Sequence, residues 1–468
     1  MASNHYEVII VGLGAAGVAA ASTLARAGRR VLALEAQGRV GGRVHSVPFG
    51  EGIVELGAEW VHGEEDNTVY EQAVKHNFPL VPQGVDLITY RSDGSKPDQD
   101  VQELINVLVE QQQCDEMELP DTPGRFGEHV ANHVKQYIKE KKPELLDDED
   151  FMEQMMDFIN LLVNNHNASN DWNDVNALDK YTPLDGYLYL SWHKYGFKTF
   201  FDILLNTHNN GPGWPTLDIE LNKEVTQIDW PQDYKDKVTV TCKDGSVYTA
   251  QSTIVTVSVG VLKERHTNLF KPKLPEVKIN AIERISIGVM DKILLSFDEV
   301  WWPLDSAFVG FLWRGEDKKK VPKESFWTTR IFAASRPMGS KNVLTFWTSG
   351  EIGKLVEILP EDKVKRECRQ LLQKFMGADI QVPEPSGIIR STWFTNPYTR
   401  GSYTFDSVAC APYPNSRTDL AAPLTDSSGR PRVLFAGEAT DETHFSTVHG
   451  AAETGYREAS KLIRNSQI

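Results

Sequence analysis

The sequence contains few cysteines and lacks any apolar run long enough to cross a membrane. Its 468 residues include four cysteines, Cys114, Cys242, Cys368 and Cys410, which lie far apart and form no Cys-x-x-Cys pair. Structural zinc sites and disulfide frameworks both need closely spaced or paired cysteines. We therefore predict reduced thiols in a reducing compartment, and no metal centre.

The sequence is also short of positive charge. Lys and Arg number 49 against 65 Asp and Glu, which gives a net charge of −16. Nucleic acids and anionic membranes attract the opposite sign, so neither is a predicted partner, whereas a small cationic molecule fits. Residues 1–7 contain no Lys or Arg, so the apolar stretch 8–25 lacks the charged start of a signal peptide. We predict a cytoplasmic protein and assign no oligomeric state.

A strand, a glycine turn, a helix and a second strand follow one another near the N-terminus. The apolar run Val8–Val11 predicts a buried parallel strand, residues 18–28 predict an Ala-rich helix, and residues 30–34 predict the next strand. Glu35 stands directly after the second strand. This order of elements is typical of a dinucleotide-binding unit of the Rossmann type.

The residues of the turn have separate predicted roles. Gly12 allows a tight turn, Gly14 lets the main chain approach a pyrophosphate, and Gly17 lets the helix pack closely on the strand. The start of the helix at Ala15 and Ala16 offers free N–H groups to the phosphates.

The cofactor follows from the residues after the turn. An acid such as Glu35 can accept hydrogen bonds from the ribose of either FAD or NAD. The segment Arg39-Val40-Gly41-Gly42-Arg43 then adds a second glycine pair and two arginines within reach of a pyrophosphate. We therefore predict FAD rather than NAD.

The rest of the chain divides into helical and strand-rich blocks, and its length favours two domains. Apolar residues at helical spacing predict helices within 67–74, 99–116, 126–165 and 195–204. Strands are predicted between residues 219 and 258 and again between 283 and 350. A helix over 362–375, a strand over 433–436 and a helix over 449–464 complete the prediction.

Motifs along nearly the whole chain resemble the flavin-containing amine oxidases, in particular their polyamine oxidase and spermine oxidase branch. They are the glycine turn with Glu35, Gly41-Gly42-Arg43, Trp60-Val61-His62-Gly63, Thr256–Lys263, Met290-Asp291-Lys292-Ile293, Trp393–Tyr403, Phe435–Thr440 and Ser446–Ala451. The helical block between residues 85 and 200 matches the family poorly.

The resemblance implies an α/β fold with two discontinuous domains. Residues 1–82, 200–285 and 400–468 would form a Rossmann-like, glutathione-reductase-like FAD-binding domain, and residues 83–199 and 286–399 a mixed sheet-and-helix substrate domain. The implied reaction oxidises a secondary amine of spermine, spermidine or an N-acetylated form to an imine. Water then gives an aldehyde and a shorter amine, while dioxygen becomes hydrogen peroxide.

The resemblance also implies roles for single residues. Lys292 would hold a water near the flavin, and His62 would bind the substrate amine or accept its proton. The substrate contacts would be Tyr403, Ser446, Thr447 and Trp60. The FAD contacts would be Gly12, Gly14, Ala15, Ala16, Gly17, Glu35, Ala36, Arg43, Gly57, Ala58, Glu59, Trp60, Val225, Glu438, Thr447 and Val448. Ser402 stands where monoamine oxidases carry the cysteine that links the flavin, so FAD is expected to bind non-covalently.

One departure from the family concerns the substrate. Polyamine oxidases often hold the distal ammonium with a carboxylate of the helical domain, but the corresponding stretch here is Asn164-Asn165-His166, with acids only at Asp171 and Asp174. Either these acids take that role, or the substrate is less cationic than spermine. The alternative functions are oxidation of a monoamine or amino acid, lysine demethylation, and a catalytically silent flavoprotein.

Overall fold

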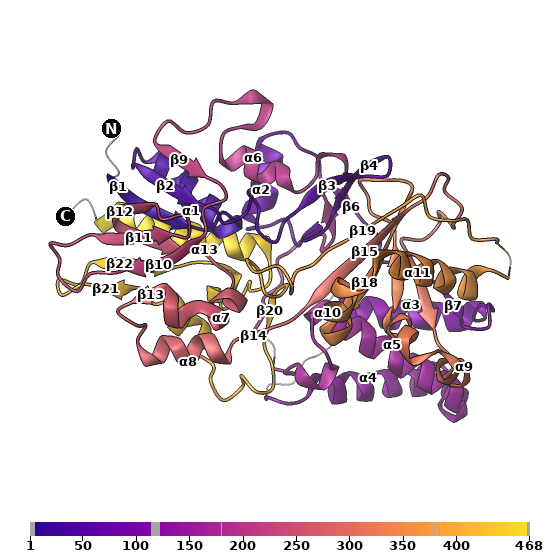
Figure 1. Cartoon of the computed structure of the whole chain (residues 1–468). Coiled ribbons are helices and arrows are strands. Elements are labelled where there is room, and N and C mark those ends of the chain that lie inside the picture. The colour runs from indigo at the N-terminus through magenta and orange to yellow at the C-terminus, as the bar shows by residue number, and fades with distance from the viewer. Residues whose placement is uncertain (1–4, 114–121, 179, 379, 466–468) are drawn as a thin grey trace.

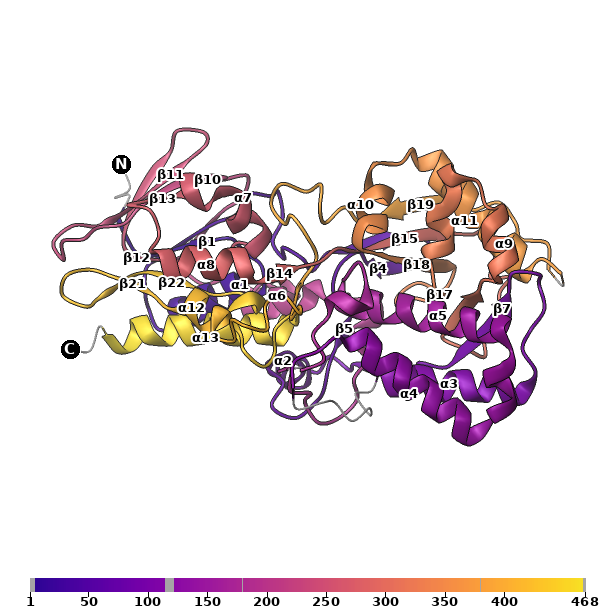
Figure 2. The same ribbon diagram turned by 90° about the horizontal axis from the view of Figure 1, so that it is seen from below.

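The computed structural model describes residues 5–113, 122–178, 180–378 and 380–465. Two lobes lie side by side, and each is built around one large β-sheet (Figures 1 and 2). Both chain ends lie at the lobe that contains the first strand and the last helix (Figure 1). Each sheet takes strands from separated parts of the sequence, so the chain passes between the lobes more than once.

The first sheet has nine strands within the described residues. They are β1 (His5–Val11), β2 (Val31–Leu34), β9 (Leu217–Glu220), β10 (Val225–Asp229), β11 (Val238–Cys242), β12 (Val247–Val255), β13 (Phe270–Lys271), β21 (Leu424–Thr425) and β22 (Pro431–Phe435). The main order is β13-β10-β11-β12-β1-β2-β9, and β22 joins β12 and carries β21. The centre is parallel, because β1 pairs with β2 and β12 in that sense, and β12 with β22.

Helices cover both faces of this sheet. The buried side chains of α1 (Ala15–Arg26), α6 (Lys198–Leu204) and α13 (Val448–Asn465) form one hydrophobic cluster with β1 and β2. Those of α7 (Val259–Leu269), α8 (Glu276–Arg284) and α12 (Ser416–Ala421) form a second cluster with β10, β11 and β22. The short helix α2 (Thr68–Lys75) packs beside α13 and α6.

The second sheet has six strands within the described residues. They lie in the order β19 (Gly387–Arg390), β15 (Met290–Ser296), β18 (Val343–Ser349), β17 (Ala333–Ser335), β16 (Phe308–Leu312) and β7 (Leu87–Arg91). Neighbours are antiparallel except for β16 and β7. Helices α3 (Gln99–Gln113), α4 (Phe126–Lys141) and α5 (Glu149–Asn167) share a core with one face. Helices α10 (Gly350–Ile358) and α11 (Glu361–Met376) share a core with the other, and α9 (Gly315–Lys320) lies near α5.

Three small sheets and several 3₁₀ turns complete the fold. The small sheets are β3 (Ser46–Phe49) with β4 (Gly52–Glu55), β5 (Trp60–Val61) and β6 (Val81–Pro82) with β8 (Leu190–Ser191), and β14 (Ser286–Ile287) with β20 (Thr404–Phe405). The 3₁₀ turns are η1 (Pro143–Asp147), η2 (Trp172–Asp174), η3 (His193–Tyr195), η4 (His208–Asn210), η5 (Lys323–Arg330) and η6 (Glu438–Thr440). β14 and β20 pair where the chain passes between the lobes.

The predicted combination of a Rossmann-like sheet with a mixed sheet-and-helix region is confirmed. Every strand of the first sheet falls within residues 1–82, 200–285 or 400–468, and every strand of the second within 83–199 or 286–399. The domain limits themselves stay a prediction.

Several helix limits differ from the sequence-based expectation. The predicted helix at 195–204 begins only at Lys198, because Gly196 has a φ of +73° and separates it from η3. The block 126–165 is two helices, divided at Pro143. α7 and α10 were not expected, since each begins within a few residues of the end of a buried strand. Ser258 marks the start of α7 by accepting the N–H of Gly260 at 3.1 Å.

Two further expectations concern thiols and membranes. Cys242, Cys368 and Cys410 are free thiols, and Cys114 lies outside the described residues. No helix in the described ranges combines the length and the apolar composition that a bilayer span needs.

The packing of the glycine turn gives a test of the fold. A Cβ at Gly17 would lie 2.0 Å from the carbonyl oxygen of Gly12, whereas the nearest atoms to a Cβ at Gly14 lie at 4.0 Å. We expect Gly17→Ala to lower the free energy of unfolding by about 1–3 kcal/mol, as overpacking does. Gly14→Ala is the matched control and should cost less than about 1 kcal/mol, the scale of a changed N-cap. Urea unfolding measures both, and equal losses would contradict the predicted packing role of Gly17.

Candidate active site

One cavity brings together the residues that the sequence singles out. Of the predicted site residues, all except Gly17 line it, from Gly12 and Glu35 at one end through Lys292 and His62 to Tyr403. Gly17 instead packs against the turn itself. The lining includes residues of both large sheets, so the cavity lies where the two lobes meet.

The start of α1 fits the phosphates of a dinucleotide. Its N-cap residue, Gly14, provides no side-chain cap, so the first N–H groups of the helix are left for a ligand. A Cβ at Gly14 would come within 4.0 Å of the main chain of Gly41 and Gly42, and all three glycines line the cavity. This cradle of bare main chain admits a pyrophosphate.

Glu35 directly follows β2 and lines the same cavity. Its carboxylate accepts the main-chain N–H of Leu13 at 2.7 Å and that of Gln37 at 2.8 Å. Burial raises the pKa of Glu35, and these hydrogen bonds work in the opposite direction. Each carboxylate oxygen has a second lone pair, so the group can also accept ribose hydroxyls. Val225 of β10 and Ala36 line the cavity nearby.

An ion pair between Arg43 and Glu438 joins the segment that follows the glycine turn to the segment after β22. Arg43 Nη1 lies 2.8 Å from Glu438 Oε1 and donates a second bond to the carbonyl of Ser402. Glu438 Oε2 also accepts the hydroxyl of Thr404 at 2.6 Å and the N–H of Ser446 at 3.0 Å. Burial alone would raise the pKa of Glu438, but Arg43, Thr404 and Arg417 hold it below the ordinary value.

Lys292 lies on β15 with its side chain 1% exposed. Its ammonium lies 2.7 Å from Glu59 Oε2 and also donates to the carbonyls of Glu55, at 3.1 Å, and Gly57, at 2.8 Å. The ring of Trp347, which faces Lys292 across the β15–β18 ladder, lies 4.6 Å from the ammonium. The sequence predicts that this lysine needs a partner in an apolar strand. Glu59 is that partner.

Aromatic side chains enclose the same part of the cavity. Trp60 stacks on Trp347 with ring centroids 5.5 Å apart, and Tyr189 meets Trp60 edge-on at 5.3 Å. The indole N–H of Trp60 donates to Gln83 at 2.8 Å. Stacked indole faces attract cations, so this group can receive an amine in its charged or neutral form.

His62 is a neutral imidazole in this cavity. Its Nδ1 lies 2.6 Å from the carbonyl oxygen of Leu188, which can only accept, so the proton is assigned to Nδ1 and Nε2 is left as the acceptor. Burial lowers the pKa of His62 to about 4, although the bond to Leu188 works against that shift. The ring therefore stays uncharged at neutral pH.

Three further predicted contacts are held by main-chain hydrogen bonds. Tyr403 donates its hydroxyl to the carbonyl of Asn165 at 2.8 Å, and burial raises its pKa. Ser446 donates to the carbonyl of Thr404. Thr447 accepts the N–H of Gly450 at 3.0 Å at the start of α13, next to Val448. The hydroxyl of Thr447 is therefore part of a helix cap.

The end of α5 closes the cavity on the side of the helical block. Asn165, His166 and Asn167 line it, whereas Asp171 and Asp174 do not. Among the described lining residues, the carboxylates are Glu35, Glu59, Glu224 and Glu438. Each accepts hydrogen bonds from the protein, and none belongs to the helical block. The possibility that Asp171 or Asp174 holds a distal ammonium is therefore not supported.

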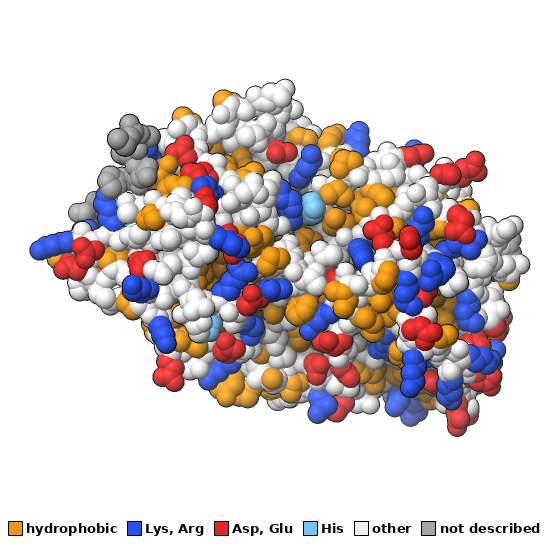
Figure 3. Space-filling model, viewed as in Figure 1, with side chains coloured by type: hydrophobic (Ala, Val, Ile, Leu, Met, Phe, Trp, Pro, Cys, Tyr) orange, Lys and Arg blue, Asp and Glu red, His pale blue; other side chains and the backbone are white. Residues whose placement is uncertain are grey.

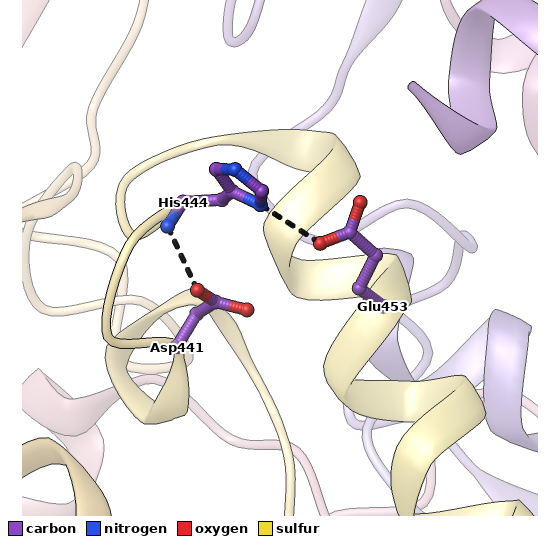
Figure 4. Close-up of side chains that lie close together, drawn as sticks. All are labelled: Asp441, His444 and Glu453. Carbon is purple, nitrogen blue, oxygen red and sulfur yellow. Dashed lines mark hydrogen bonds and ion pairs between the residues drawn. The ribbon is translucent and has the colours of Figure 1, made fainter. Parts of the chain in front are cut away.

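Side chains that could bind a metal approach one another outside the cavity lining. The ligand atoms of Asp441, His444 and Glu453 lie within 4.8 Å of one another, the one such group within the described residues (Figure 4). His444 Nδ1 pairs with Glu453 at 3.0 Å, and Asp441 accepts the N–H of His444 at 2.7 Å. These bonds account for the cluster, and we assign no metal to it.

Charges on the outer surface are mixed. On the face viewed in Figure 3, acidic and basic side chains are interspersed over both lobes. No large single-sign patch marks this face.

Several lining residues were not predicted from the sequence. Trp347 was read only as part of an aromatic strand, although its place opposite Lys292 follows once the β15–β18 register is known. For Trp393 the sequence leaves a core and a cavity position open; it lines the cavity, and its indole N–H donates to Leu56 at 3.2 Å. Tyr189 lies in a region without a motif. Only its aromatic character could have marked it.

A central parallel sheet, an uncapped glycine turn, a buried acid directly after the second strand and an adjoining aromatic pocket are together typical of a dinucleotide-dependent oxidoreductase. Residues 15–463 match the family described as flavin containing amine oxidoreductase. The chain belongs to this family, and its cofactor is FAD. Its activity is the FAD-dependent oxidation of an amine.

Relatives with two kinds of activity resemble the chain. Peroxisomal N(1)-acetyl-spermine/spermidine oxidase from Bos taurus is 28% identical over 496 aligned residues, which cover 98% of this chain and 94% of that protein. Lysine-specific histone demethylase 1 homolog 2 from Oryza sativa subsp. japonica is also 28% identical, over 98% of this chain and 57% of that protein. A solved structure of putrescine oxidase redesigned for cofactor binding matches with a TM-score of 0.67 at 17% identity, over 98% of this chain and 99% of that one. That likeness supports the fold.

The Arg43–Glu438 pair leads to a prediction for stability. We expect Glu438→Gln to lower the free energy of unfolding at pH 7 by about 2–3 kcal/mol, the scale for bonds to a charged group. The pKa of Glu438 is lower in the folded protein than in the unfolded chain. The difference in the free energy of unfolding between wild type and Glu438→Gln should therefore be constant above the ordinary carboxyl pKa. It should shrink as the pH falls through the pKa that Glu438 has in the folded protein. Urea unfolding from pH 7 to pH 3 measures it.

The control for this prediction is a carboxylate in a surface ion pair. Glu351 is 69% exposed and pairs with Lys354 at 2.7 Å. Glu351→Gln should change stability by less than about 0.5 kcal/mol. A loss in Glu438→Gln no larger than in this control would contradict the role assigned to the pair.

Proposed function

We propose that the protein oxidises a secondary amine of a polyamine, with N-acetylated forms as the preferred substrates. The observation that carries this proposal is a single cavity that joins the FAD end to Lys292, His62 and an aromatic pocket, and then to the amide side chains at the end of α5. The likeness to N(1)-acetyl-spermine/spermidine oxidase supports the same substrate class. The imine that forms takes up water and gives an aldehyde and a shorter amine.

The cofactor supplies the electron transfer, and the protein supplies binding and orientation. When bound along Gly14, Glu35 and Arg43, FAD would supply the acceptor for a hydride from the carbon beside the nitrogen, and dioxygen would become hydrogen peroxide with two electrons and two protons. The stacked rings of Trp60 and Trp347 guide the amine, and Tyr403 forms part of the wall. The hydroxyl of Ser402 is occupied by Met290 through two 2.8 Å bonds, so we propose that FAD is held without a covalent link.

His62 would bind the amine as it loses its proton. A protonated amine holds its lone pair in an N–H bond, so it must become neutral before the adjacent C–H bond can be oxidised. Nε2 of a neutral His62 offers the acceptor for that proton or for the remaining N–H.

The far end of the cavity favours a weakly charged group. Among the described residues, the end of α5 lines the cavity with Asn165, His166 and Asn167, and the helical block contributes no carboxylate to the lining. A second ammonium of spermine would lose water there without a full counter-charge, whereas an acetamide can both donate to and accept from these groups.

A substrate panel tests the proposed function. We expect peroxide release with N1-acetylspermine, spermine and spermidine. The kcat/KM for the acetylated form should be at least about tenfold higher than that for spermine. The second ammonium of spermine lacks a charged partner in the cavity, which costs about 1.5 kcal/mol. Benzylamine and a dimethyl-lysine peptide complete the panel, the second because of the demethylase relative.

The outcomes of the panel are distinct. Turnover of benzylamine or of the peptide alone, or of nothing, would contradict the proposed substrate class. A spermine value above that of the acetylated form would contradict the acetylated preference only. As a control on the preparation, acid precipitation should leave a colourless pellet and yellow supernatant, because the flavin is not covalently linked.

The neutral state of His62 gives a second prediction. His62→Asn should lower kcat/KM for the best amine by about 10²-fold, the lower range for a positioned acid–base group. Because burial keeps the pKa near 4, wild type and variant should have parallel pH profiles between pH 6 and 9. His76→Asn is the matched control, since His76 Nδ1 also meets a main-chain carbonyl but outside the cavity lining. If kcat/KM of the wild type changed with pH near pH 6.5 and that of the variant did not, His62 would titrate there and the prediction would be wrong.

A further inference from the structure

All three hydrogens of the Lys292 ammonium have partners within one short segment. A lysine ammonium has three N–H donors and no acceptor. The three acceptors are the carbonyls of Glu55 and Gly57 and the carboxylate of Glu59, at 3.1, 2.8 and 2.7 Å. Glu55, Gly57 and Glu59 therefore all bind the Lys292 ammonium. A water held by Lys292 near the flavin would have to share one of these hydrogens.

Glu59 and Lys292 form a buried ion pair inside the cavity lining. Their side chains are 5% and 1% exposed. Glu59 Oε2 lies 2.7 Å from the ammonium nitrogen. Two such charges depend on each other, because a buried charge left alone is strongly disfavoured. The resemblance and the cavity assign Lys292 to the flavin region, so its net charge matters to the flavin.

We propose that Glu59 is a positioning and charge-balancing residue of the flavin site. It holds the Lys292 ammonium against segment 55–59 and cancels its charge, so that the pair adds no net positive charge beside the flavin. Reduction adds negative charge to the flavin ring, and a free cation nearby would favour the reduced form. Glu59 therefore sets how readily the flavin is reduced. This inference depends on FAD, which the family supplies, and is independent of the amine.

A salt bridge that serves only the fold makes a different prediction. In that case, loss of Glu59 would change stability or FAD retention, while the reduction equilibrium of the bound flavin would stay constant. The midpoint potential of the holoenzyme therefore distinguishes a charge-balancing role from a purely structural role. Its measurement needs no amine substrate.

The test measures that potential at pH 7 by dye equilibration in wild type, Glu59→Gln, Lys292→Met and the double variant. Glu59→Gln leaves the ammonium with two carbonyls and the Trp347 face but no counter-charge. It should shift the equilibrium toward reduced flavin by about tenfold or more, which is about 30 mV for two electrons. In the Lys292→Met background the same change should have less than a twofold effect, because no ammonium is left for Glu59 to balance.

Lys292→Met alone gives an independent reading if Glu59→Gln does not retain its flavin. If Glu59 balances the charge of Lys292, the Lys292→Met variant should have a flavin reduction equilibrium within about twofold of wild type. An unbalanced lysine would instead give a shift of about tenfold toward oxidised flavin. That shift would overturn the proposal.

Two controls complete the design. Glu59→Asp keeps the charge and should stay within about twofold of wild type. Asp100→Asn removes a carboxylate from an exposed pair with Lys142, at 2.9 Å, and should have no effect. Equal shifts from Glu59→Gln in both lysine backgrounds would show that Glu59 acts without Lys292, and no shift in either would show a structural role alone. Both results overturn the proposal.

Discussion

The cost of burying charge is the constraint on which the centre of this protein depends. Arg43 pairs with Glu438, and Lys292 pairs with Glu59, in surroundings where an unpaired charge would cost several kcal/mol. Each pair joins segments that are hundreds of residues apart in the sequence. The second pair ties β15 of one lobe to the segment that follows the glycine turn of the other. The Lys292–Glu59 pair therefore ties the two lobes together beside the cavity, whereas the Arg43–Glu438 pair joins two segments of the first lobe.

The same constraint gives the middle of the cavity its character. Its cations and carboxylates are bonded to one another or to the main chain, and His62 is neutral because burial lowers its pKa. Glu55, just behind the lining, accepts bonds from Ser46 and Phe197, and burial raises its pKa to about 7. An entering amine therefore meets aromatic faces and single acceptors rather than a strong field of either sign. Such a centre favours the neutral amine that the chemistry requires.

The parts of the site that depend on local sequence could be predicted. The glycine turn, α1 and Glu35 form a continuous unit whose geometry follows from glycine conformations and strand order, and they lie as expected. Gly17 packs the helix, which is the role its position predicts, and it is the one predicted site residue outside the lining. The roles assigned through the family resemblance stay predictions.

The partners of these residues could not be predicted in the same way. Trp347 meets Lys292 because of the register between β15 and β18, and Glu59 meets it because of the path of segment 55–59. Neither follows from spacing along the chain. Helices α7 and α10 were missed for a related reason, since strand and helix adjoin with almost no intervening loop. Pairing between distant segments decides these features, and one sequence does not encode it in a readable pattern.

The end of α5 links the proposed substrate preference to the wall of the cavity. The last carbonyls of a helix carry partial negative charge, so they can attract a cation, but more weakly than a carboxylate. Two of these carbonyls, those of Asn165 and His166, already accept the hydroxyl of Tyr403 at 2.8 and 3.2 Å. These two carbonyls therefore hold Tyr403 in place and are less able to attract a cation. Under the proposed function, the carbonyls bonded to Tyr403 and the absence of a carboxylate among the described lining residues of the helical block would together favour a weakly charged distal group.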